Sequence, residues 1–230
     1  MKILAVETST LAGGAAVLDG DHVVGAVLLN IALTHSERLM AMVDRLLVDC
    51  GLTLRQLEGL AVSVGPGSFT GLRVGIAAVK GLALATGLRV AAVPTLDALA
   101  AAIPFCSAAV CPVLVARKGE VYVSLYRWRE GRMVRMWDYL ALSPADAAAR
   151  IETPVVLLGD AAGACRGLMP GDADAWLAPP AQQVPSAVLV AQLGHRALQS
   201  GESAGVDDLV PIYLRPSEVE LGARGGTRSS

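Results

Sequence analysis

Aromatic residues make up only 4% of the 230-residue sequence, although 53% of its residues are hydrophobic. The apolar content therefore comes mainly from Ala, Leu and Val, a mixture that suits an α/β protein. An excess of positive charge is also missing, since 19 basic residues stand against 21 acidic ones. The chain thus lacks the general electrostatic footprint of a nucleic-acid-binding protein, and any contact with RNA has to be local or made through a partner.

Closely spaced cysteine pairs and long apolar runs are absent as well. Apolar runs such as Val74 to Val79 are far shorter than the roughly 20 residues that cross a membrane. Met1-Lys2 leads directly into an apolar strand pattern without a cleavage site for a signal peptide. We therefore expect a cytoplasmic protein with no membrane partner. Four cysteines lack C-x-x-C spacing and are interpreted as reduced core thiols: Cys50, Cys106, Cys111 and Cys165.

The chain is organised around the stretch from Gly59 to Gly87. An apolar, β-branched run predicts a buried strand over 60–64. Three glycines and a proline follow within 65–71, so the chain must turn there. Residues 72–86 form a helical pattern that is apolar on every face, and Gly87 caps its end. Because such a helix cannot face water along its length, it needs a second cover besides the sheet, from another helix of this chain or from another protein.

The turn before that helix also permits a phosphate-binding interpretation, because a helix N-terminus favours an anion. Its glycine spacing matches neither a Walker A loop, nor G-x-G-x-x-G, nor the G-x-S-x-G of a nucleophile elbow. Residues 7–10 supply a carboxylate and three hydroxyls after the first strand, which suit either a metal-bound phosphate or a polar turn. The candidate nucleotide contacts are Glu7, Thr8, Ser9, Gly65, Gly67 and Ser68.

The predicted elements follow a βββαβα order twice, which predicts two related lobes around a cleft. We expect a first lobe over 1–103, a second lobe over 104–221 and a disordered tail over 222–230. In the first part the expected strands are 2–6, 15–18, 23–29, 60–64 and 89–93, and the expected helices are 34–50, 72–86 and 95–103. In the second part the expected strands are 113–116, 121–127, 133–137 and 155–158, and the expected helices are 144–150 and 187–199.

Two further patterns bear on binding. The helix over 34–50 begins with a Thr34-x-x-Glu37 capping box and carries an apolar arc broader than one sheet contact usually requires. A basic hairpin region in the second lobe suits contact with RNA phosphate, or the charged side chains that protect a solvated strand edge. Its basic residues are Arg117, Lys118, Arg127, Arg129, Arg132 and Arg135.

Five motifs make the chain resemble the TsaB family, also called YeaZ, of tRNA threonylcarbamoyladenosine biosynthesis. They are ILAVETST at the start, THSERLM on the first helix, VGPGSFTGLRVGIAAVKGLALA in the centre, ARKGEVYVSLY in the second lobe and PIYLRPSE near the end. The resemblance implies a two-lobed α/β fold of the actin-like, sugar-kinase-like ATPase type. It also implies a non-catalytic scaffold subunit that activates TsaD, the transferase acting on the tRNA adenosine next to the anticodon.

The resemblance further implies which surface is used. In this family the first helix and the glycine-loop helix pack against the equivalent helices of TsaD, or of a second copy when TsaD is absent. We therefore expect a heterodimer with TsaD, a ternary complex with TsaE, a homodimer in isolation and contact with tRNA only through the complex. The interface residues implied are Leu39, Met42, Val43, Leu46, Gly75, Ala78 and Val79.

The same resemblance argues against catalysis. TsaD-type proteins carry a metal-binding H-x-x-x-H pair where this chain reads TLDAL at 95–99, so both imidazoles are missing. Val115 stands where relatives commonly have Asp, and Glu7 stands where Asp is commoner. We therefore expect no catalytic residue, no metal site and no required cofactor. The alternative is an autonomous ATPase or phosphotransferase that binds ATP or ADP, and an older, glycoprotease-like interpretation is a metallopeptidase.

Overall fold

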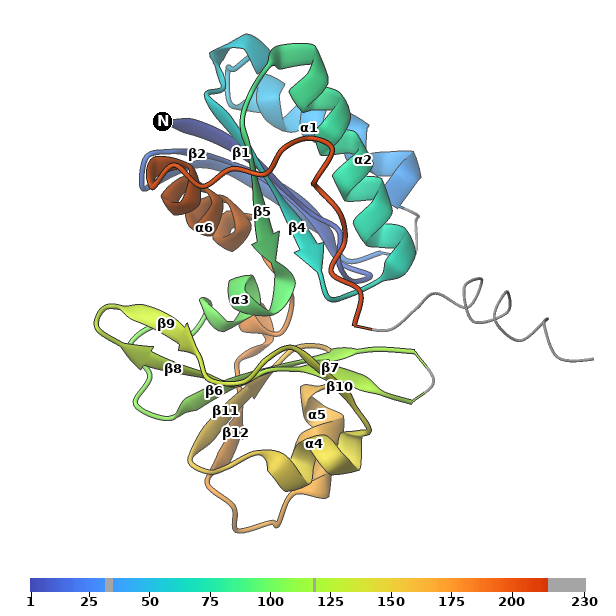
Figure 1. Cartoon of the computed structure of the whole chain (residues 1–230), viewed down its shortest axis with the longest axis vertical. Helices are drawn as coiled ribbons and strands as arrows, with labels where there is room; N and C mark the ends of the chain where they lie inside the picture. The colour runs from blue at the N-terminus through green and yellow to red at the C-terminus, as the bar shows by residue number, and fades with distance from the viewer. Residues whose placement is uncertain (32–34, 118, 215–230) are drawn as a thin grey trace, which may run out of the picture.

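The computed structural model describes residues 1–31, 35–117 and 119–214, which form two lobes (Figure 1). The sheet of the first lobe contains β1 (Lys2–Glu7), β2 (Gly13–Asp19), β3 (His22–Leu29), β4 (Gly59–Gly65) and β5 (Val90–Pro94). Its spatial order is β3-β2-β1-β4-β5. The first three strands pair antiparallel and β1, β4 and β5 pair parallel, so the carboxyl ends of β1 and β4 meet at one edge.

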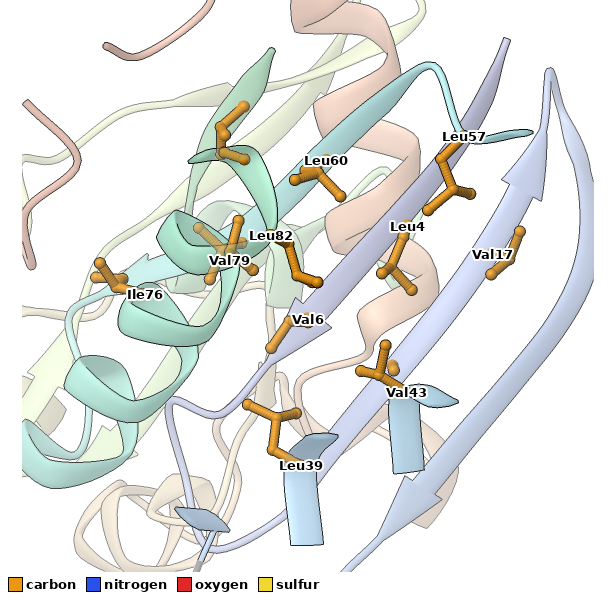
Figure 2. Close-up of a cluster of buried hydrophobic side chains, with 14 of the residues drawn as sticks. Leu4, Val6, Val17, Leu39, Val43, Leu57, Leu60, Ile76, Val79 and Leu82 are labelled. Carbon is orange, nitrogen blue, oxygen red and sulfur yellow. The ribbon is translucent and has the colours of Figure 1, made fainter. Parts of the chain in front are cut away.

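Side-chain alternation along β1 divides the first lobe into two packed layers. The helices are α1 (His35–Asp49), α2 (Phe69–Thr86) and α6 (Ala187–Gln199). Leu4 and Val6 point toward α1 and α2, as Figure 2 shows, whereas Ile3 and Ala5 pack against α6. Because both faces of the strand are covered, it is a continuous apolar run rather than an alternating one.

The second lobe repeats this topology. Its main strands are β6 (Ala109–Val115), β7 (Val121–Val123), β10 (Leu140–Leu142), β11 (Val155–Leu158) and β12 (Ala175–Leu177), in the order β10-β7-β6-β11-β12. Helices α4 (Pro144–Arg150) and α5 (Ala162–Leu168) cover one face. A hairpin of β8 (Tyr126–Arg129) and β9 (Arg132–Arg135) extends from β6. The equal strand orders confirm the predicted two-lobed fold.

The chain crosses between the lobes twice, and this corrects the predicted boundaries. Helix α3 (Thr95–Ala100) lies between the sheets, where Leu96 and Leu99 pack against Val110 and Leu158 of the second lobe. The change of lobe predicted at 103/104 falls just after this helix. However, α6 packs on the first sheet, so the second lobe does not extend to residue 221. The tail over 222–230 lies outside the described residues.

Local signals placed most helix ends correctly. Ser186 caps α6 and accepts a hydrogen bond from Val188 N, and Gly87 ends α2 at φ 73°. Helix α3 ends at Ala100 rather than at residue 103. Thr34 of the predicted capping box lies outside the described residues.

Among the described residues, one helix meets the length and composition criteria of a membrane-spanning segment. This helix is α2, which packs along β4, and Leu72, Ile76 and Val79 are among its buried residues. The core helix of a soluble lobe passes the same test.

Candidate functional site

The first candidate site is the outer surface of α1 and α2. Both helices pack on the first sheet and against each other, and Figure 1 shows them on the side of that sheet away from α6. Met40 and Val48 of α1 are 48% and 66% exposed, and Leu84 of α2 is 75% exposed. Ala77 and Gly81 lie on the same exposed line of α2. We call these five residues the α1–α2 face.

The interface residues implied by the family resemblance lie beneath this face rather than on it. Five of them, Leu39, Met42, Val43, Leu46 and Val79, are buried in the core of their own lobe (Figure 2). Gly75 is buried against Thr8, and Ala78 is only half-buried. Their broad apolar arcs therefore hold the helices on the sheet. Any contact of α1 and α2 with a partner falls to the exposed residues.

Much of the second cover for α2 comes from the segment 205–214 of the same chain. Leu209 is 1% exposed and joins the core between α2 and the sheet. Ile212 N donates a hydrogen bond to Val64 O at 2.7 Å, and Lys80 Nζ donates to Asp207 O at 3.5 Å. With the sheet, α1 and this segment around it, only a narrow strip of α2 stays exposed. Sequence patterns gave no signal for this packing.

The second candidate site is the edge where β1 and β4 end. The structure places the six predicted nucleotide contacts at this edge, where Thr8, Ser9, Gly67 and Ser68 hold the two turns against each other. Ser68 N donates to Ser9 O at 2.6 Å, and a Cβ on Gly67 would overlap that same oxygen. Ser68 Oγ accepts from Gly71 N at 3.2 Å, and Thr8 Oγ1 donates to Gly71 O at 2.8 Å. Because these groups are hydrogen-bonded to one another, they are not available as donors to a phosphate.

Glu7 lies at the bottom of this edge in an unusual environment. It is 1% exposed, and its Oε1 accepts a hydrogen bond from Ser9 N. Burial raises the pKa of the Glu7 carboxyl, and hydrogen bonds from Ser9, Ser63 and Thr8 offset part of that rise. Within the described part of the chain, Glu7 Oε2 and Ser9 Oγ are buried without a hydrogen-bond partner. Glu7 is therefore a buried carboxyl with reduced acidity rather than an exposed metal ligand.

The second lobe offers an acid that the sequence analysis missed. Asp160 follows β11, and its Oδ1 accepts a hydrogen bond at 2.7 Å from the backbone N of Val115, the position at which the sequence analysis noted a missing carboxylate. Burial raises the pKa of Asp160 although part of its surface stays exposed. The sequence signal that could have indicated it is an acidic residue that follows a buried strand after a single glycine, Gly159. Over residues 1–31, 35–117 and 119–214, no group of three or more His, Cys, Asp or Glu side chains is arranged to hold a metal ion.

The predicted basic hairpin divides into two places. Arg117 lies in the turn after β6, with its guanidinium 5.6 Å from the Phe69 ring of the first lobe. Arg73 lies 3.8 Å over the same ring, which stacks on Tyr213 at 5.1 Å. The other arginines lie on the β8–β9 hairpin, and Lys118 lies outside the described residues. The two groups therefore cannot act as one phosphate-binding strip.

Comparisons with known proteins agree with the geometry. Residues 27–157 match the family described as TsaD, tRNA N6-adenosine threonylcarbamoyltransferase. The chain is 32% identical over 225 residues to the tRNA threonylcarbamoyladenosine biosynthesis protein TsaB of Bacillus subtilis, covering 96% of each chain. This chain belongs to the TsaB family. The solved structure of YeaZ from Pseudomonas aeruginosa matches with a TM-score of 0.79 and 29% identity, covering 93% of this chain and 99% of that one.

Family membership settles the process and the fold. TsaB proteins belong to tRNA threonylcarbamoyladenosine biosynthesis, as the sequence motifs predicted. The fold is that of the actin-like ATPases and sugar kinases. Component A of (R)-2-hydroxyglutaryl-CoA dehydratase from Acidaminococcus fermentans shares it with a TM-score of 0.52 at 11% identity, covering 86% of this chain and 99% of that one. The match to the TsaD description shows that this TsaB protein and the transferase are built alike.

Proposed function

We propose that the chain is a non-catalytic accessory subunit that binds TsaD through the α1–α2 face. With TsaE as a third member, it supports threonylcarbamoylation of the tRNA adenosine next to the anticodon, and it contacts tRNA only through the complex. The observation that carries this proposal is the α1–α2 face, a helical surface with three large apolar side chains exposed on it. Surface of this kind marks a site of protein association.

The similarity to TsaD supports this pairing. Two proteins with the same fold can place equivalent helices against each other around an approximate two-fold axis. Gly81 and Ala77 have small side chains, so a partner helix can approach the exposed side of α2 closely. Val48, Met40 and Leu84 then fill the space beside that helix. The same surface on a second copy gives the homodimer that we propose for the isolated protein.

In the proposed role, this chain does not itself need to bind a cofactor. Thr8, Ser68 and Gly71 at the β1–β4 edge are hydrogen-bonded to one another, and the Asp160 carboxylate of the opposite lobe already accepts a hydrogen bond from Val115 N. The contact of ATP or ADP with this edge stays a prediction. ATP turnover by the purified chain, measured alone and then with TsaD and TsaE, tests this part. Fast turnover by the chain alone would favour the autonomous ATPase.

The interface is tested by placing a charge on the α1–α2 face without disturbing the core. Val48→Glu and Leu84→Glu are suitable because both side chains are exposed, whereas a charge at Val43 would be buried and would unfold the lobe. Loss of a central apolar contact typically costs about 2 kcal/mol or more, so we expect affinity for TsaD to fall roughly 30-fold or more. Co-purification with TsaD and formation of threonylcarbamoyladenosine in tRNA are the measurements.

Leu168→Glu is the matched control, because Leu168 is a 56% exposed leucine on α5 of the other lobe. It should bind TsaD as the wild type does. If both face variants still co-purify with TsaD at wild-type affinity, α1 and α2 are not the interface.

A further inference from the structure

A cavity of about 610 Å³ opens on the side of the molecule opposite to the α1–α2 face. Its walls come from both lobes: the end of β5 with α3, the β8–β9 hairpin, and the outer side of α6. In Figure 1 α6 and the β8–β9 hairpin lie on one side of the first sheet, and α1 and α2 lie on the other. A partner bound to α1 and α2 therefore leaves this cavity open, and no step proposed above uses it.

Three arginines bring positive charge to the cavity. Arg132 and Arg135 come from β9, and Arg196 comes from α6 of the other lobe. Within the described residues, the side chains of Arg132 and Arg196 make no hydrogen bond or ion pair, so their guanidinium donors are available. Arg135 lies over the Tyr139 ring at 4.2 Å. Planar guanidinium groups are the preferred protein partners of phosphate.

Two aromatic rings form the rim. Phe105 is 80% exposed, and its ring lies 4.8 Å from the Trp128 ring, tilted by 55°. Phe105 also has a left-handed backbone, with φ at 59°. A bulky residue in that region costs about 1–3 kcal/mol, and strain of this kind gathers at ligand-binding sites. The chain thus holds a large apolar ring in water and in a strained conformation at the mouth of a cavity.

The lining of the cavity also supplies hydrogen-bond acceptors. Asp97 Oδ1 accepts hydrogen bonds from the hydroxyls of Tyr126 at 2.6 Å and Tyr139 at 2.8 Å, which fixes the carboxylate in place. Glu202 adds a second carboxylate to the wall. Three guanidinium groups and two carboxylates give the lining a small net positive charge, which suits a single phosphate group rather than a di- or triphosphate. The carboxylates suit sugar hydroxyls or a base amino group.

We propose that this cavity binds a nucleoside phosphate, either free or as an unpaired nucleotide of an RNA strand; direct RNA binding here would replace the proposed contact with tRNA only through the complex. The base stacks on Phe105 and Trp128, and the phosphate contacts Arg132, Arg135 and Arg196. Aromatic stacking beside basic side chains is the means by which proteins hold unpaired nucleotides. The volume lies within the roughly 300–1,000 Å³ of small-ligand sites. The proposal does not depend on the proposed binding of TsaD.

The test measures binding of AMP by calorimetry, and of a fluorescein-labelled single-stranded RNA heptamer by anisotropy, to the full-length chain. Arg132→Gln, Arg196→Gln and Phe105→Gly are the cavity variants. Phe105→Gly removes the ring and also relieves the left-handed strain, so it should not lower stability. Each variant should weaken binding about tenfold, the usual effect of losing a charge-assisted hydrogen bond or one stacked base. Arg129→Gln is the control, because Arg129 is exposed on the same hairpin and does not line the cavity.

The outcomes separate the sources of the ligand. RNA that binds at least tenfold more tightly than AMP identifies an RNA nucleotide, and equal affinities identify a free one. The proposal fails if neither probe binds the wild type at millimolar concentration, or if the cavity variants bind as Arg129→Gln does. It also fails if inorganic phosphate binds as tightly as AMP, because the base then contributes nothing.

Discussion

Two glycines of α2 should respond in opposite ways to the same substitution. Gly75 and Gly81 both lie inside the helix, where replacing glycine by alanine stabilises an exposed position by about 1 kcal/mol. A Cβ on Gly81 would meet nothing within 4 Å. Gly81→Ala should therefore raise the free energy of unfolding by about 1 kcal/mol, which corresponds to roughly 2–4 °C in Tm for a chain of this size.

Gly75→Ala gains the same helix propensity but meets Thr8. The added methyl would overlap Thr8 Oγ1, the hydroxyl that donates to Gly71 O at 2.8 Å and is fully buried. Displacing that hydroxyl leaves a buried hydrogen bond unmade, at about 1–3 kcal/mol, and crowding of the packed turn adds about 1–3 kcal/mol. After subtraction of the propensity gain, the variant should be destabilised by about 1–4 kcal/mol.

Urea unfolding followed by far-UV circular dichroism measures both variants. Gly75→Ala with Thr8→Ala is the matched control, because removal of the hydroxyl and methyl of Thr8 makes room for the new Cβ. Gly75→Ala should therefore cost less stability in the Thr8→Ala background than it costs in the wild type. If Gly75→Ala stabilises the protein as much as Gly81→Ala does, α2 does not pack closely on the turn after β1, and the account of this edge is wrong.

Two further predictions concern buried titratable groups. Burial raises the pKa of Glu7 above its ordinary value of 4.5, so its contribution to stability is complete below about pH 4.5 and is lost as the pH rises through the raised pKa. Glu7→Gln should therefore gain stability relative to the wild type between pH 4.5 and 7 in urea titrations, and a constant difference across that range would refute this assignment. Burial also raises the pKa of the Cys111 and Cys165 thiols, so Ellman's reagent should label the half-buried Cys50 and Cys106 in the native protein and leave the other two unreacted until denaturant is added. Rapid labelling of all four thiols without denaturant would contradict the burial.

The sequence by itself determined the family and the order of most elements, although it missed β10, α5 and β12. The central strand, turn and helix over 59–87 follow from apolar periodicity, glycine placement and the left-handed cap at Gly87. These are local signals, because each depends on backbone geometry within a few residues. The repeated βββαβα order predicted two lobes, and the structure shows the same strand order in both sheets.

Only the tertiary structure decided which apolar residues are available to a partner. The arcs on α1 and α2 suggested an uncovered surface, yet Val43 and Val79 face their own sheet and segment 205–214 covers the flank of α2. Covering of this kind depends on chain segments more than 100 residues apart, which periodicity within a single helix cannot reveal. The return of α6 to the first sheet and the cavity that it forms with the β8–β9 hairpin arise in the same way. Sequence patterns fix where a helix is apolar, and long-range packing fixes how much of that surface remains exposed to water.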